Sequence, residues 1–129
     1  MFLNDEQQQL ASDIAERLIA RGETVAVAES TTGGLVSAAL LGVAGASRYY
    51  AGGGVLYTLN SRTALAGVPA ETYANYRGTT PEMLGALAEA MRERLGATWR
   101  IAEPGAAGAG RNRFGVPAAG PAGRRAGPP

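Results

Sequence analysis

The sequence predicts one α/β domain of three layers, with helices on both faces of a mainly parallel sheet. Short β-branched segments alternate along the chain with longer segments whose apolar residues recur at helical spacing, as parallel α/β domains require. The length of 129 residues suits a single domain with a buried core. The chain has no cysteine, so disulfides and thiolate metal sites contribute nothing to this fold.

The first two elements are an amphipathic helix over residues 4–20 and a buried strand over residues 24–28. Leu10, Ile14 and Leu18 recur at helical spacing, and Gly22 is a typical helix stop. The strand is short, rich in β-branched residues and bounded by glycines, which is typical of a strand buried on both faces.

The middle of the chain predicts a helix over residues 35–43, a strand over residues 49–58 and short helices over residues 61–66 and 69–76. Three consecutive glycines, Gly52–Gly54, interrupt the strand. Glycine inside a strand marks a bulge or a close approach of another backbone. We therefore expect one of these two features in this strand.

The clearest helix start is Thr80-Pro81-Glu82, because threonine caps, proline fits the first helical position and glutamate complements the helix dipole. This helix extends to about Leu95. A third strand over residues 98–102 then leads into a glycine-rich loop over residues 105–110.

The last part of the chain changes composition. Residues 117–129 are only proline, alanine, glycine and arginine, which cannot bury enough apolar surface to offset the entropy of ordering. We therefore divide the chain into an α/β domain at residues 1–116 and a disordered tail at residues 117–129. The tail should add no sheet strand, so the domain should lack its C-terminal strands.

Composition excludes several classes of function. The net charge is +1, all twelve basic residues are arginine, and they form no clustered basic face, which argues against a nucleic-acid partner. Histidine is absent, so the usual neutral-pH base is missing. No long apolar run indicates a membrane segment, and we expect a cytoplasmic protein without a metal or a cofactor.

The segment most typical of a functional site follows the first strand, where Ser30 enters a turn formed by Thr31, Thr32, Gly33 and Gly34. Glycines let a ligand approach the backbone, and unpaired amides at a helix start hold anions. The alternative interpretation is that one of the three hydroxyl groups only caps the helix. Glu29 is the neighbouring carboxylate, and we interpret it as structural because adjacent strand residues point to opposite faces.

Two further loops follow strands, at residues 57–62 and 105–113. The carboxyl ends of parallel strands meet at one edge of a sheet, where ligands bind in open α/β folds. We therefore expect the serine turn and these two loops to form one site. Taken alone, Tyr57 is also typical of a core aromatic, and Arg62 is also typical of a solvated surface residue.

Five strings occur in order over residues 5–117: Ala-Glu-Ser-x-Thr-Gly-Gly, Val-x-Gly-Ala-Ser, Gly-Gly-Val-Leu-Tyr-Thr, Leu-x-Gly-Val-Pro and Gly-Ala-Ala-Gly followed by Arg-Asn-Arg-Phe-Gly. Together they resemble the CinA C-terminal domain family, many of whose members are nicotinamide-nucleotide amidases. The resemblance implies hydrolysis of the carboxamide of nicotinamide mononucleotide to the acid and ammonia. It also implies a homo-oligomer.

The resemblance assigns residues to this reaction. Ser30 matches the nucleophile, Tyr57 matches a tyrosine of the site, and Arg62 stands where the family has the lysine that partners the serine. Pro104 stands near a family threonine, and Thr31 replaces a common cysteine. The residues expected to bind the pyridine nucleotide are Thr31, Thr32, Gly33, Gly34, Gly105, Gly108, Arg111 and Arg113.

Arg62 is the departure that matters most for activity. A guanidinium stays protonated at working pH, so it cannot accept the serine proton as a neutral lysine amine can. Three interpretations therefore stay open: an amidase that is slow or inactive, a non-catalytic member that binds a nucleotide or a protein partner, and a truncated or frameshifted product. Codons composed only of G and C encode all four residue types of the tail, which is why a frameshift is considered.

Overall fold

The computed structural model describes residues 2–74, 80–104 and 125–127. Its helices are α1 (Asp5–Arg21), α2 (Leu35–Leu41), α3 (Leu59–Ala66), α4 (Ala70–Tyr73) and α5 (Pro81–Leu95), with a 3-10 helix, η1 (Ala46–Arg48), before the second strand. Its strands are β1 (Val25–Glu29), β2 (Tyr50–Val55), β3 (Trp99–Glu103) and β4 (Arg125–Gly127).

The sheet has the order β2-β1-β3-β4, and β1 pairs in parallel with both β2 and β3. In the registers of these pairs, Glu29 lies opposite Val55 on one side and Glu103 on the other. The carboxyl ends of the three parallel strands therefore lie at one edge of the sheet. The segments that follow β1, β2 and β3 all start at this edge.

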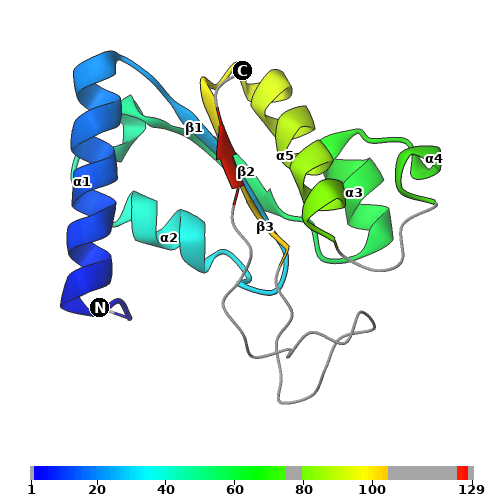
Figure 1. Cartoon of the computed structure of the whole chain (residues 1–129), viewed down its shortest axis with the longest axis horizontal. Helices are drawn as coiled ribbons and strands as arrows, with labels where there is room; N and C mark the ends of the chain where they lie inside the picture. Colours follow the sequence, from blue (N-terminus) through cyan, green and yellow to red (C-terminus); the bar gives the residue numbers. More distant parts are fainter. Residues whose placement is uncertain (1, 75–79, 105–124, 128–129) are drawn as a thin grey trace.

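Helices cover both faces of the sheet, with α1 and α2 on one side and α3, α4 and α5 on the other (Figure 1). The central strand β1 alternates between the two layers, as a strand buried on both faces must. Val25 and Val27 pack in the core beneath α1 and α2, whereas Ala26 and Ala28 pack in the core beneath α5. The three-layer α/β/α fold is thus confirmed.

The helix ends follow the sequence signals. Asn4 and Gln7 form a reciprocal capping box at the start of α1, and Gly22 ends that helix in the left-handed region at φ 64°. Thr80 accepts a hydrogen bond from the Met83 N–H at the start of α5. The helix predicted over residues 69–76 is α4, which is shorter and ends at Tyr73. Residues 75–79 are not described.

The glycines of β2 form both features that a glycine run predicts. The register between β1 and β2 shifts at Val25, and Gly52 has φ 146°, a backbone conformation that side chains rarely adopt. At Gly53 a Cβ atom would lie 2.5 Å from the Val27 carbonyl oxygen. The backbones of β1 and β2 therefore approach too closely at this point for any other residue.

Gly53→Ala is expected to lower the free energy of unfolding by about 2 kcal/mol or more, because the added methyl group forces β1 and β2 apart. Gly54→Ala is the matched control, since its Cβ would meet only side-chain carbons, the nearest 3.4 Å away. Urea unfolding of both variants measures the difference. Equal losses in the two variants would contradict the packing argument.

The structure corrects the expectation that no strand follows residue 116. β4 pairs antiparallel with β3, and Ala126 lies opposite Ile101. Main-chain hydrogen bonds form this pairing, so a segment without large apolar side chains can still complete a sheet edge. The frameshift interpretation loses the support that it drew from an absent strand. The domain boundary at residue 116 and the remaining tail residues lie outside the described residues.

In the described part of the chain, no helix combines the length and the apolar character needed to cross a membrane.

Candidate active site at the carboxyl edge of the sheet

The turn after β1 holds Ser30 in a buried position, with 3% of its surface exposed. The Ser30 carbonyl accepts a 3.2 Å hydrogen bond from the Gly33 N–H, which closes the turn. Gly33 and Gly34 have φ values of 62° and 102°, so both positions favour glycine. The strand, turn and helix predicted around Ser30 are present.

Glu29 caps helix α2, which is the structural role expected of it. Its carboxylate accepts hydrogen bonds from the N–H groups of Gly34 (3.2 Å), Val36 (2.9 Å) and Ser37 (2.8 Å). The interpretation that a hydroxyl of the turn caps the helix is wrong, because the N-cap residue is Gly34 and it makes no side-chain cap bond. These three amides are therefore occupied, which corrects the expectation that the helix start offers unpaired donors to an anion.

Burial by itself raises the pKa of Glu29, because it disfavours the charged form. Hydrogen bonds from the Thr32 hydroxyl and from Ser37 and Val36 outweigh that effect, so the pKa of this carboxyl lies below its usual value. Glu29 is therefore an ionised cap for α2, and a carboxylate fixed in this way is a poor proton acceptor.

The residue that the sequence analysis missed is Glu103, the last residue of β3, which is fully buried. Its carboxylate accepts hydrogen bonds from the N–H groups of Ser30 (2.8 Å) and Thr32 (2.9 Å) and from the Thr31 hydroxyl (3.0 Å). The Thr32 hydroxyl lies 2.6 Å from both Glu29 and Glu103. The sequence feature that could have predicted its role is a carboxylate directly after a predicted strand, at the sheet edge where Ser30 was expected.

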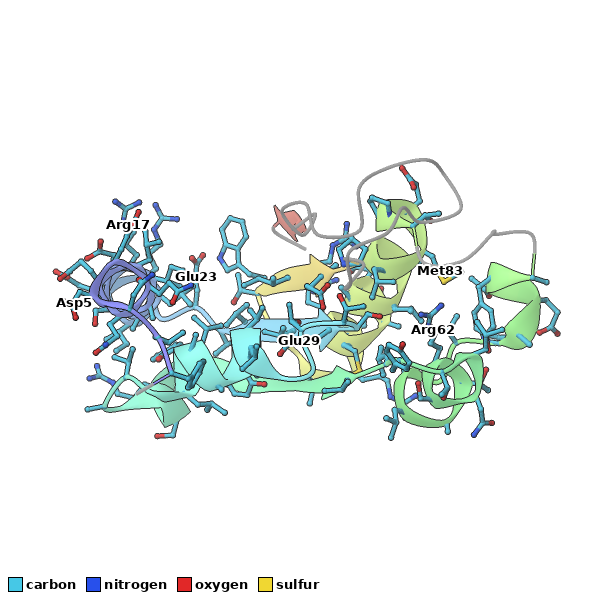
Figure 2. The ribbon with its side chains drawn as sticks, turned by 90° about the horizontal axis from the view of Figure 1, so that it is seen from below. Asp5, Arg17, Glu23, Glu29, Arg62 and Met83 are labelled. Atoms are coloured by element: carbon cyan, nitrogen blue, oxygen red, sulfur yellow. The ribbon has the colours of Figure 1, made fainter. Side chains whose placement is uncertain are left out.

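Arg62 is buried, with only 2% of its surface exposed, so the interpretation of a solvated surface residue is wrong. Its Nε donates to the Leu56 carbonyl at 3.1 Å, and its Nη2 lies 3.4 Å from the Tyr57 carbonyl. Its Nη1 contacts the sulfur of Met83 on α5, and Figure 2 shows the two side chains close together. Burial lowers the pKa of Arg62, and the nearby Tyr73 partly opposes this.

The main chain of Leu56 connects Arg62 to the serine turn. The Leu56 N–H donates to the Glu29 carbonyl at 2.7 Å, and its own carbonyl accepts from Arg62. Arg62, on helix α3, therefore contacts the segment that pairs with the residue before Ser30. Tyr57 follows directly and is 64% exposed, so it is not a core aromatic.

The turn amides that remain open to a ligand are few. Those of Ser30 and Thr32 bind Glu103, and that of Gly33 binds the Ser30 carbonyl. Among the described residues, none accepts a hydrogen bond from the Thr31 N–H. This amide lies next to Ser30 in the sequence.

The predicted ligand residues Gly105, Gly108, Arg111 and Arg113 lie outside the described residues, so their part in the site stays a prediction. In residues 2–74 and 80–104, no group of three acidic, cysteine or histidine side chains is arranged to hold a metal ion.

Comparison with known proteins identifies the family. The family model of the CinA C-terminal domain matches residues 7–123. The chain belongs to the CinA C-terminal domain family. A CinA-like protein of Acidobacterium capsulatum is 46% identical over 90 residues, which cover 70% of this chain and 22% of the relative. A CinA-like protein of Prochlorococcus marinus is 42% identical over 105 residues, 81% of this chain and 24% of the relative.

Solved structures agree with this assignment. The competence/damage inducible protein CihA of Agrobacterium tumefaciens superposes with a TM-score of 0.81 at 29% identity, covering 91% of this chain and 71% of that one. A CinA superfamily protein of Klebsiella pneumoniae gives 0.78 at 31% identity, covering 87% and 70%. The chain spans about a quarter of the length of the CinA-like relatives, so their activity as whole proteins bears on it only as a proposal.

Proposed function

We propose that this CinA-family chain binds a pyridine nucleotide at the carboxyl edge of its sheet and hydrolyses the carboxamide slowly or not at all. The observation that carries the proposal is the environment of Arg62. This residue stands where the family has lysine, and it is buried as a donor to two main-chain carbonyls. A donor held in this way cannot take a proton from Ser30.

The chemistry explains why a missing base matters. Amide hydrolysis through a serine begins when the hydroxyl oxygen attacks the carboxamide carbon and loses its proton. A positioned base contributes about 10²–10⁴-fold to such a step. Arginine stays protonated at working pH, and Glu29 is bound by the amides of α2. Neither group is therefore available to Ser30.

Binding is supported by features that do not depend on the base. The Thr31 amide and the exposed Tyr57 both follow strands that end at the same edge of the sheet. The Thr31 N–H would donate a hydrogen bond to the carboxamide oxygen, and the tyrosine ring would pack on the pyridine. The nucleotide phosphate is assigned to Arg111 and Arg113, since guanidinium groups bind phosphate bidentately.

Calorimetric titration with nicotinamide mononucleotide, together with an ammonia-release assay on the same preparation, tests this proposal. We expect saturable binding and an ammonia rate no higher than that of the Ser30→Ala variant. Tyr57→Ala should weaken binding about tenfold or more, because a stacked aromatic contact is lost. Turnover well above that of Ser30→Ala would contradict the inactive assignment, and absence of binding would contradict the assignment of the ligand.

A further inference from the structure

The carboxylate of Glu103 lies at the centre of the serine turn. It is the only group among the described residues that binds three consecutive residues of that turn: Ser30 through its N–H, Thr31 through its hydroxyl, and Thr32 through both. These contacts span 71 to 73 positions of sequence. The turn is therefore fixed to β3 as well as to β1, from which it emerges.

The register of the sheet explains this placement. Glu103 and Glu29 are paired partners at the ends of β3 and β1, and both are buried. A buried carboxylate is costly unless hydrogen-bond donors replace its water shell. Glu103 obtains these donors from the turn. The orientation of the turn and the burial of Glu103 therefore stabilise each other.

The two carboxylates divide the local donors between them. Glu29 accepts hydrogen bonds from amides of helix α2, whereas Glu103 accepts them from amides of the turn itself. The Thr32 hydroxyl lies between them, 2.6 Å from each. A hydroxyl has one proton and donates to one acceptor at a time, so it links the cap and the turn into one unit.

We propose that Glu103 is a positioning residue for Ser30, which its carboxylate orients through the Ser30 and Thr32 amides. The proposal deepens the assignment of Ser30 as the reacting residue and rests on it. By occupying these two amides, Glu103 leaves the Thr31 N–H as the turn amide for which no described residue is the acceptor. The effect of Glu103 is exerted through the turn, because its buried carboxylate binds Ser30, Thr31 and Thr32.

Amide hydrogen exchange of the full chain tests the structural part without any need for activity. Glu103→Ala should speed exchange at Ser30 and Thr32 by about tenfold or more relative to Val27, a buried residue of β1 that reports on the stability of the sheet. Glu103→Gln keeps a carbonyl acceptor in the same place and should restore most of the protection. If Glu103→Ala does not fold, Glu103→Asp replaces it, because its shorter side chain withdraws the acceptor.

Exchange that rises equally at Ser30, Thr32 and Val27 would overturn the proposal, since Glu103 would then stabilise only the domain as a whole. So would unchanged exchange at Ser30 and Thr32.

The kinetic part uses ammonia release in the Arg62→Lys background, in which activity is expected. In this background Glu103→Ala should lower kcat about 10²-fold with little change in KM, because the reacting group is misplaced. Glu103→Gln should recover most of the lost kcat. A raised KM with unchanged kcat would assign Glu103 to binding and overturn the proposal. If Arg62→Lys itself shows no turnover, the proposed role of Ser30 fails, and hydrogen exchange alone decides the role of Glu103.

Discussion

Replacing Arg62 with lysine is expected to give the chain measurable amidase activity on nicotinamide mononucleotide, about 10²-fold above the unmodified chain. Burial lowers the pKa of Arg62, and the same desolvation would lower that of a lysine toward neutrality, where the amine can accept a proton. The gain should be partial, because only the neutral fraction of a lysine amine can accept a proton at working pH. Ammonia release at saturating substrate measures it.

The control is the double variant Arg62→Lys with Ser30→Ala, which should have no activity above background. Arg62→Lys should also lose about 1–3 kcal/mol of stability, because a lysine cannot satisfy both the Leu56 and the Tyr57 carbonyl in the geometry of the guanidinium. Activity is therefore compared well below the unfolding temperature of each variant. Activity that survives Ser30→Ala would show that another group performs the chemistry.

Glu29→Gln is expected to cost about 3 kcal/mol of unfolding free energy at pH 7, because an amide cannot accept all the hydrogen bonds that the carboxylate receives from α2. The folded-state pKa of Glu29 is lowered, so its stabilising effect is complete above the unfolded pKa of about 4.3. That effect disappears as the pH falls through the lower folded pKa. The two proteins should therefore become similarly stable in strong acid.

Urea unfolding at pH 7, 5 and 3 measures the difference between Glu29→Gln and the unmodified chain. Glu16→Gln, on the exposed side of α1, is the matched control and should change little at any of these pH values. A loss for Glu29→Gln that is the same at pH 3 as at pH 7 would mean that the charge of Glu29 does not contribute to the cap.

Local signals were sufficient to predict most of the fold. Gly22, Thr80 and Pro81 determine helix ends through contacts with near neighbours, so a single sequence carries the information. The pairing of β4 was not predictable in this way, because it depends on the backbone of β3 and not on the side chains of the tail.

The candidate site was predicted in position but not in detail. Ser30 could be placed because a strand, a glycine pair and a helix follow one another in sequence. Glu103 could not, because its role depends on being opposite Glu29 in the sheet register, and that pairing joins residues 74 positions apart. The burial of Arg62 was also not predictable from the sequence, because its partners include Met83, which lies on another helix.

The glycine run in β2 has a consequence for the behaviour of the protein at high concentration. Among the described strands, β2 lies at one end of the sheet, where unpaired main-chain groups could template the addition of a strand from another molecule. The irregular backbone at Gly52 breaks the straight row of donors and acceptors that such an intermolecular ladder needs. The same feature that lets two strands approach closely inside the domain thus opposes fibrous aggregation along its outer border.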